Sequence, residues 1–232
     1  MSLAGKIDLG GFRRPHGIDV EPGSGDVFVT TELPSRLLRL DPRARKVVKD
    51  YDVKGKAPHL VKLASGWAYT SNTDSGTVSA VNLKTGDVTI LETGARPQGM
   101  AFSPDGRRLY VTNMNSDSIS IIDTQTKAVT GSIPTGKTPV RIMITPDGKT
   151  AVYALQLGEA VGFADIEKRK EVGQVKLTGQ PVSLTFSADV KYAFSSVQSQ
   201  DKIFVISLSS RRIEKVISAP HGAGPDPYLP LR

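Results

Sequence analysis

The strongest constraint on the fold is a repeat of about 42 residues that runs through nearly the whole chain. Each unit opens on a proline, and an apolar run later in the unit ends on a short polar residue. The opening prolines are Pro15, Pro58, Pro97, Pro139 and Pro181, and the polar residues are Asp41, Asn82, Asp123, Asp165 and Ser207. The polar residues follow one another at steps of 41, 41, 42 and 42. A repeat of this length with four short strands is typical of a β-propeller blade.

The third repeat shows the expected blade most clearly. Its strand-like segments cover residues 98–102, 108–113, 118–123 and 128–135, and residues 103–106 form a Ser-Pro-Asp-Gly turn between the first two. Proline presets the backbone of such a turn and glycine tolerates positive φ. We therefore expect an all-β fold, a single β-propeller domain over residues 1–232. Its five four-stranded blades are expected at residues 15–57, 58–96, 97–138, 139–180 and 181–224, with an outer strand of a preceding blade at 1–14 and the start of a next blade at 225–232.

Composition narrows the chemistry. The chain has no cysteine, which excludes disulfides, thiolate metal sites and cysteine nucleophiles. No apolar run approaches the roughly 20 residues of a membrane-spanning helix, and residues 1–6 lack the apolar stretch of a signal peptide. The formal charge of +7 favours anionic partners. We expect no transmembrane segment and a protein or an anionic small molecule or polymer as partner.

A family resemblance rests on the third repeat. Tyr110, Val111, Thr112 and Asn113 spell the motif of the YVTN family of β-propeller repeats, and the turn at residues 103–106 is similar to that family's consensus. The family comprises bacterial and archaeal, surface-layer-like repeat proteins. The resemblance implies a binding scaffold of the cell envelope, in the periplasm or outside the cell.

The resemblance also implies how many blades a complete ring would contain. Members of this family resemble seven-bladed rings, which need about 290 residues at this repeat length. We therefore expect this chain to be an incomplete part of a larger, seven-bladed ring; the alternatives are an open five-bladed arc and a tight five-bladed ring. An open ring would expose apolar blade faces, so self-association is expected if the ring is open.

Candidate ligand-binding residues lie in the loops that join the fourth strand of one blade to the first strand of the next. In a propeller these loops surround the mouth of the central channel. Four of them carry a cation just before the proline, and His16, His59 and Gln98 follow the first three prolines. We expect a positive collar and a ligand-binding site at the channel mouth. Its residues are Arg14, His16, Lys56, His59, Arg96, Gln98, Lys137 and Arg141.

No metal ligands, catalytic residues or cofactor are assigned from the sequence. The two histidines lack an evident third ligand partner. One acid also recurs in each loop between the second and third strands, at Glu32, Asp74, Asp117, Glu159 and Asp201. A catalytic carboxylate is needed once or twice, so we interpret this repeated set as structural.

Three classes of function remain open. The resemblance favours a non-catalytic scaffold for protein–protein interaction or ligand binding. The alternative is a propeller-type lactonase or other hydrolase in the central channel, with Arg14, His16 and His59 as its candidates. The third is non-specific nucleic-acid binding through a basic rim on the opposite face, although this rim has no interleaved stacking aromatics. The rim residues are Arg43, Arg45, Lys46, Lys84, Lys127, Lys168, Arg169, Lys170, Arg211 and Arg212.

Overall fold

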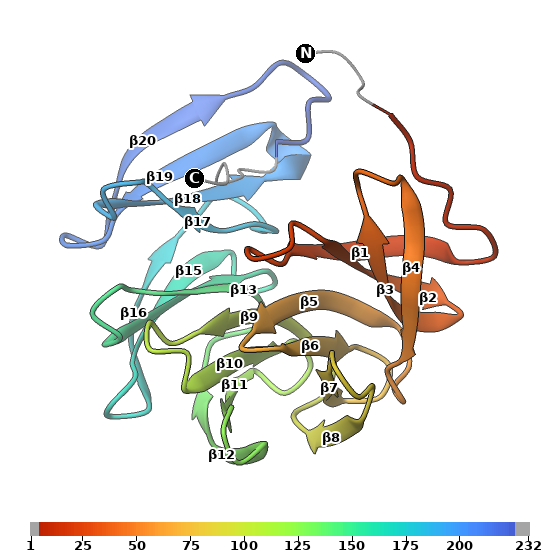
Figure 1. Ribbon diagram of the computed structural model, residues 1–232. Helices are drawn as coiled ribbons and strands as arrows, with labels where there is room; N and C mark the ends of the chain where they lie inside the picture. The colour runs from red at the N-terminus through yellow and green to blue at the C-terminus, as the bar shows by residue number, and fades with distance from the viewer. Residues whose placement is uncertain (1–4, 226–232) are drawn as a thin grey trace. The chain divides into compact units, whose positions relative to one another are not determined.

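The computed structural model describes residues 5–225, and nearly all of its regular structure is β-strand. The chain forms two compact units, Met1–Gln98 and Gly99–Arg232. Five four-stranded antiparallel sheets follow one another along the chain, each built from consecutive strands (Figure 1). These sheets are blades of a β-propeller, numbered 1 to 5 here in chain order.

The first unit holds blades 1 and 2. Blade 1 has the strand order β1-β2-β3-β4, and blade 2 has the order β5-β6-β7-β8. The bounds are β1 Arg13–Val20, β2 Val27–Leu33, β3 Ser35–Asp41, β4 Lys46–Asp52, β5 Pro58–Ala64, β6 Trp67–Asn72, β7 Thr77–Asn82 and β8 Val88–Glu92.

The second unit holds blades 3, 4 and 5, and the boundary between the units falls inside β9. A single 3₁₀ turn, η1 at Gln198–Gln200, is the one helical segment between residues 5 and 225. The strand bounds are β9 Pro97–Phe102, β10 Arg108–Asn113, β11 Ser118–Asp123, β12 Ala128–Pro134, β13 Pro139–Ile144, β14 Thr150–Leu155, β15 Ala160–Asp165, β16 Lys170–Lys176, β17 Thr185–Phe186, β18 Tyr192–Val197, β19 Lys202–Ser207 and β20 Arg212–Ser218.

The polar residue that ends each third strand shapes the following turn. The Asp123 carboxylate accepts hydrogen bonds from the N–H groups of Gln125 (2.9 Å) and Thr126 (2.7 Å). Lys127 then adopts a positive φ of 55°, which brings the chain back into β12. Asn82 accepts the same two backbone bonds in blade 2 through its amide oxygen. A short polar side chain in this position therefore closes the turn without longer-range contacts.

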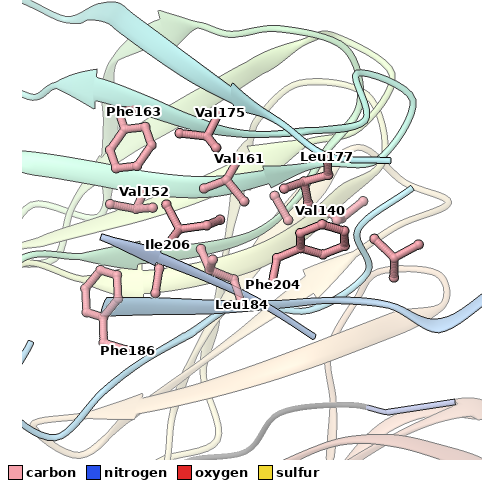
Figure 2. Packing of buried hydrophobic residues seen from close by; sticks show 13 residues of the cluster. Val140, Val152, Val161, Phe163, Val175, Leu177, Leu184, Phe186, Phe204 and Ile206 are labelled. Atoms are coloured by element: carbon pink, nitrogen blue, oxygen red, sulfur yellow. The ribbon is translucent and has the colours of Figure 1, made fainter. Parts of the chain in front are cut away.

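Apolar side chains fill the space between successive blades. In the second unit, one buried cluster combines residues of blade 4, such as Val161 and Phe163, with residues of blade 5, such as Phe204 and Ile206 (Figure 2). Another cluster joins blade 3 to blade 4 and includes Ile133. Successive residues of a strand point to opposite faces of its sheet, and a blade that lies between two other blades buries both faces. This explains why the clusters form between successive blades.

Side-chain hydroxyls connect adjacent blades at the strands' inner edge. Thr112 accepts the N–H of Gly99 (2.8 Å) and donates to the carbonyl of Val140 in blade 4 (3.3 Å). A Cβ on Gly99 would lie 2.5 Å from that carbonyl oxygen, so the close approach of the two blades requires glycine. The threonine of the Tyr-Val-Thr-Asn motif is thus a structural residue.

Two expectations about the blade ends need correction. The first is the outer strand at residues 1–14, because residues 5–12 form no strand. Ile7, Leu9 and Phe12 instead pack against a buried cluster of blade 1 that includes Leu38. Strand pairing would need the backbone of a neighbouring strand, whereas burial of these apolar side chains needs only the packing against blade 1. The expected start of a next blade lies almost entirely outside the described residues.

The second correction is the first strand of blade 5, which is shorter than expected. β17 covers two residues, although the repeat predicts a strand from about Pro181. Side-chain hydroxyls take over here: Ser195 donates to the carbonyl of Ser183 (2.8 Å), and the hydroxyls of Ser183 and Ser196 lie 2.6 Å apart. These bonds satisfy buried polar groups that the strand ladder leaves open.

Candidate functional site

Two histidines from neighbouring blades stack at the start of β1 and β5. The ring centroids of His16 and His59 lie 3.6 Å apart, with an angle of 32° between the ring planes. His16 is exposed and His59 is half-buried. Their approach follows from the backbone, because Gly17 lies against the carbonyl of His59 and leaves no room for a Cβ. The structure therefore brings together the two imidazoles that the sequence places after Pro15 and Pro58.

Two of the predicted cations in the first unit are paired with acids of the loops between second and third strands. Arg14 lies 3.0 Å from Glu32, and Arg96 lies 3.8 Å from Asp74. Both arginines have positive φ, 55° and 54°, and their side chains are 68% and 49% exposed. Surface pairs of this kind contribute little stability, up to about 1 kcal/mol. They do lower the net positive charge of the predicted collar.

Lys56 differs from these arginines. Its backbone is held, since its N–H donates to the Ser75 hydroxyl (2.7 Å) and its carbonyl accepts the N–H of Asp74 (3.3 Å). Its side chain is exposed, and no ion pair joins its ammonium to a carboxylate of the part of the chain that the structure describes. Lys56 is therefore a cation whose charge is available to a ligand.

Gln98 occupies the same repeat position as the two histidines. Its backbone carbonyl accepts the Ser71 hydroxyl (2.9 Å), which fixes the start of β9. The side-chain Oε1 is buried and has no hydrogen-bond partner among the described protein groups. A buried polar atom without a partner costs free energy unless water or a ligand completes its bonding. Gln98 thus offers an acceptor for an N–H or O–H group.

Lys137 and Arg141, the predicted site residues of the second unit, are both held by protein groups. Lys137 lies 2.8 Å from Asp117, and the other carboxylate oxygen accepts the N–H of Thr138 (2.8 Å). Burial raises the pKa of the Asp117 carboxyl, but the hydrogen bonds from Lys137 and Thr138 outweigh it and hold that pKa below its usual range. The hydrogen bond to Asp117 raises the pKa of Lys137. Arg141 is half-buried and donates to the carbonyl of Val140 (3.4 Å).

Three of the four cations expected to form the positive collar are thus paired with carboxylates, and Lys56 differs from them in the described residues. Four of the five repeated acids contact other protein groups: Glu32, Asp74 and Asp117 pair with these cations, and Asp201 binds backbone N–H groups. Asp201, the last of the five in chain order, accepts the N–H groups of Gly222 (2.8 Å) and Gly224 (3.0 Å). Sequence reasoning did not pair the acids with these cations. A similar separation along the sequence could have indicated two of these pairs, because Lys137 follows Asp117 by 20 residues and Arg96 follows Asp74 by 22.

Two residues of the predicted basic rim hold neighbouring blades. The guanidinium of Arg169 donates to the carbonyl of Thr130 (3.4 Å), and that of Arg211 donates to the carbonyl of Val172 (3.2 Å). Arg211 also lies over the ring of Phe163, 5.3 Å from its centroid. These two arginines are tied to the outer strands of the preceding blades. Part of the rim's charge therefore has a structural role.

Neither a metal cluster nor a membrane-spanning helix is found in the described residues. Between residues 5 and 225, no group of three or more histidine, cysteine, aspartate or glutamate side chains is placed to hold a metal ion. No helix in the same range is long and apolar enough to cross a bilayer. The chemistry that the first unit presents is a pair of imidazoles among exposed cations and a buried amide oxygen.

Comparison with protein families identifies the fold family. The profile described as YNCE-like beta-propeller matches residues 101–225, more than half of the chain. The chain belongs to the YNCE-like β-propeller family. The family profile covers blades 3 to 5, which include the Tyr-Val-Thr-Asn motif on β10. No curated protein matches the sequence significantly.

Solved structures with the same fold include several enzymes. Kuenenia stuttgartiensis hydrazine synthase is 24% identical, with a TM-score of 0.74 over 90% of this chain and 66% of that chain. Dihydro-heme d1 dehydrogenase NirN is 20% identical, with a TM-score of 0.73 over 90% and 49%. Staphylococcus aureus virginiamycin B lyase with quinupristin is 18% identical, with a TM-score of 0.80 over 95% and 75%. The chain thus spans under two thirds of the first two, and at these identities the likeness shows the fold alone.

Proposed function

We propose that this family member is a non-catalytic binding module of the cell envelope, in the periplasm or outside the cell, that takes an anionic ligand at the first unit. The observation that carries the proposal is the exposed Lys56, with no carboxylate partner among the described residues, in the loop that leads to His59. The stacked pair of His16 and His59 lies at the start of the adjoining strands. The ligand class is an acidic protein segment or an anionic small molecule or polymer.

Charge supports an anionic ligand. Arg14, Lys56 and Arg96 contribute three positive charges, and their partners Glu32 and Asp74 contribute two negative ones. The 3.8 Å separation of Arg96 and Asp74 is long and both side chains are about half exposed. A ligand carboxylate, sulfate or phosphate can compete for such a guanidinium, because a charge-assisted bidentate bond is stronger than a loose surface pair.

Hydrogen bonding supports selectivity. The buried Oε1 of Gln98 needs a donor, and imidazole N–H groups can donate to an anion. A ligand with an anionic group and a neighbouring N–H or O–H would meet both requirements. Acidic peptides and acidic polysaccharides have this combination.

The test is a titration calorimetry panel with three defined polyanions: poly-L-glutamate, a sulfated heparin oligosaccharide and a mixed-sequence single-stranded oligonucleotide. We expect one of the first two to bind, and the double variant Lys56→Gln/Arg96→Gln to weaken it about tenfold or more. Lys46→Gln/Lys84→Gln is the control, since it also removes two positive charges from exposed side chains of the first unit, at or just before a fourth strand. Equal losses in both variants would show diffuse attraction by net charge and would contradict the proposed site.

The alternative of a propeller-type hydrolase rests on the imidazole pair, because histidine is the commonest general acid or base. It predicts turnover of a lactone or ester panel that His16→Ala abolishes. Turnover of that kind would replace the binding proposal. Preference for the oligonucleotide, with a steep salt dependence that Lys168→Gln/Lys170→Gln reduces, would instead favour the nucleic-acid alternative.

A further inference from the structure

A polar pocket lies in the second unit, at the end of the strands opposite to the interblade loops. It has a volume of about 460 Å³ and lies between the β9–β10 turn of blade 3 and the β13–β14 turn of blade 4. The two turns touch, since a Cβ on Gly148 would lie 3.5 Å from Cδ of Pro104. The charged and hydroxyl-bearing lining residues are Ser103, Asp105, Arg107, Arg108, Tyr110, Asp123 and Asp147.

Comparison of equivalent positions in the five blades shows which residues of this turn the fold requires. Asp105 and Asp147 recur as turn residues in blades 3 and 4, so the fold itself accounts for them. The arginine pair Arg107 and Arg108 occurs in blade 3 alone. The same two positions hold Gly25 and Asp26, Gly66 and Trp67, Lys149 and Thr150, and Lys191 and Tyr192 in the other blades. The turn folds without these arginines, which therefore need another explanation.

Both guanidinium groups are available in this pocket. Arg108 is the cross-strand partner of Asp123 in the β10–β11 pair, and Tyr110 lies on the same face two residues further along β10. No ion pair is found between Arg107 or Arg108 and any carboxylate within residues 5–225. Each guanidinium is a planar fork of N–H donors that suits a carboxylate or phosphate, and both residues line the pocket.

In each of the carboxylates of Asp105, Asp123 and Asp147, only one oxygen accepts hydrogen bonds within the described chain. Oδ1 of Asp105 accepts the Ser103 hydroxyl (2.6 Å) and the N–H of Arg107 (3.0 Å), and Oδ1 of Asp147 accepts the Thr145 hydroxyl (2.6 Å) and the N–H of Lys149 (3.0 Å). Oδ1 of Asp123 is likewise used by its turn. Within the described chain, no hydrogen bond is found to the Oδ2 atoms of these three residues.

The turn bonds also keep these groups charged. The hydrogen bond from the Ser103 hydroxyl lowers the pKa of Asp105, and that from the Thr145 hydroxyl lowers the pKa of Asp147. Fixed, ionised carboxylates with a free oxygen are suitable acceptors for an ammonium group. The lining thus combines rigid carboxylate acceptors with guanidinium donors that form no ion pair with a carboxylate within residues 5–225.

We infer that this pocket binds a small zwitterion, a molecule with an anionic group for Arg107 and Arg108 and an ammonium group for the free oxygens of Asp105 and Asp147. A simple anion would meet three carboxylates, and a simple cation would meet two guanidinium groups, so each alone is disfavoured by like-charge repulsion. Amino acids and short peptides with free termini have the required chemistry.

The probe is the dipeptide Ala-Ala, titrated at millimolar concentrations while amide chemical shifts are followed by nuclear magnetic resonance. We expect shift changes at Gly106, Arg108 and Gly148. N-acetylated and C-amidated Ala-Ala should each bind at least about tenfold more weakly, since each lacks one charge. This comparison uses the unaltered protein. Absence of shifts at these residues, or equal shifts with the blocked peptides, would overturn the proposal.

The second arm uses the Arg107→Gln/Arg108→Gln variant. We expect it to bind Ala-Ala at least about tenfold more weakly, with unchanged amide shifts in blade 5. Lys149→Gln is the matched control, because Lys149 holds the repeat position of Arg107 in blade 4 and does not line the pocket. Retained binding by the double variant, or an equal loss in the control, would also overturn the proposal.

Discussion

The hydroxyl of Thr30 donates a hydrogen bond to the carbonyl oxygen of His59, 2.8 Å away, and so joins blade 1 to blade 2. The same hydroxyl accepts the N–H of Gly17 (2.8 Å). Ser71 forms the corresponding bond to the carbonyl of Gln98. A hydroxyl thus recurs beside this repeat position, and it fixes the backbone from which the candidate ligand-binding side chains project.

Replacing Thr30 by valine should destabilise the protein by about 1–3 kcal/mol. Thr30 is fully buried, and without its hydroxyl the N–H of Gly17 and the carbonyl of His59 would each lose a hydrogen-bond partner. Thr30→Ser retains the hydroxyl and should restore most of that loss. Urea unfolding followed by circular dichroism measures both. Equal stability of the valine variant and the natural protein would show that the bond between the blades contributes nothing.

Gly17→Ala should be destabilising, by about 1–3 kcal/mol, because the new Cβ would lie 2.5 Å from the carbonyl oxygen of His59 and the two strands would have to separate. Gly23→Ala is the control, since nothing lies within 4 Å of the position that its Cβ would take, and its effect should stay within about 0.5 kcal/mol. The measurement is thermal unfolding of both variants. A similar change in the two would contradict the close approach of β1 and β5.

Ile133 and Ile217 occupy the same position of the fourth strand in blades 3 and 5, with 0% and 39% exposure. Ile133→Ala should cost about 2–5 kcal/mol because it opens a cavity between packed blades. Ile217→Ala should cost no more than about 1 kcal/mol, since part of its surface already contacts solvent. Equilibrium unfolding of the two variants provides the comparison. A large loss for Ile217→Ala would mean that this blade face is covered in solution.

Stability should fall in acid as the turn carboxylates take up protons. The hydrogen bond from the N–H of Thr126 is the main cause that lowers the pKa of Asp123 in the folded protein. A lowered folded pKa contributes stability that is present above the unfolded value of about 3.9 and is lost as the pH falls through the folded value. The free energy of unfolding should therefore decrease from about pH 5 towards pH 2.

The control for this pH dependence is Asp123→Asn, which keeps an acceptor oxygen and removes the titrating group. Blade 2 has asparagine at this position naturally, since Asn82 closes its turn with two backbone hydrogen bonds. The variant should show a smaller loss of stability between neutral and acidic pH, measured by urea unfolding at each pH. An unchanged slope would assign the acid sensitivity to other groups.

Much of the fold could be predicted from the sequence because its determinants are local. The proline that opens β5, β9 and β13, the Pro-Asp-Gly turn before β10 and the polar residue at Asp123 each act within a few residues of chain. Short-range features of this kind repeat visibly. Residues 5–12 show where prediction from local sequence fails. Their sequence is similar to a fourth strand, but they form no strand, because a strand also needs a neighbour with which to pair.

The candidate sites depend on contacts that no local pattern specifies. From the amino-acid order alone follow an all-β chain of five blades, the equivalent positions of His16, His59 and Gln98, and a surplus of positive charge. The stacking of the two imidazoles, the neutralisation of Lys137 by Asp117 and the pocket beside Arg107 and Arg108 emerge only once the chain is folded. These relations join side chains from different strands and turns, and the packing of one blade on the next sets the distances between them.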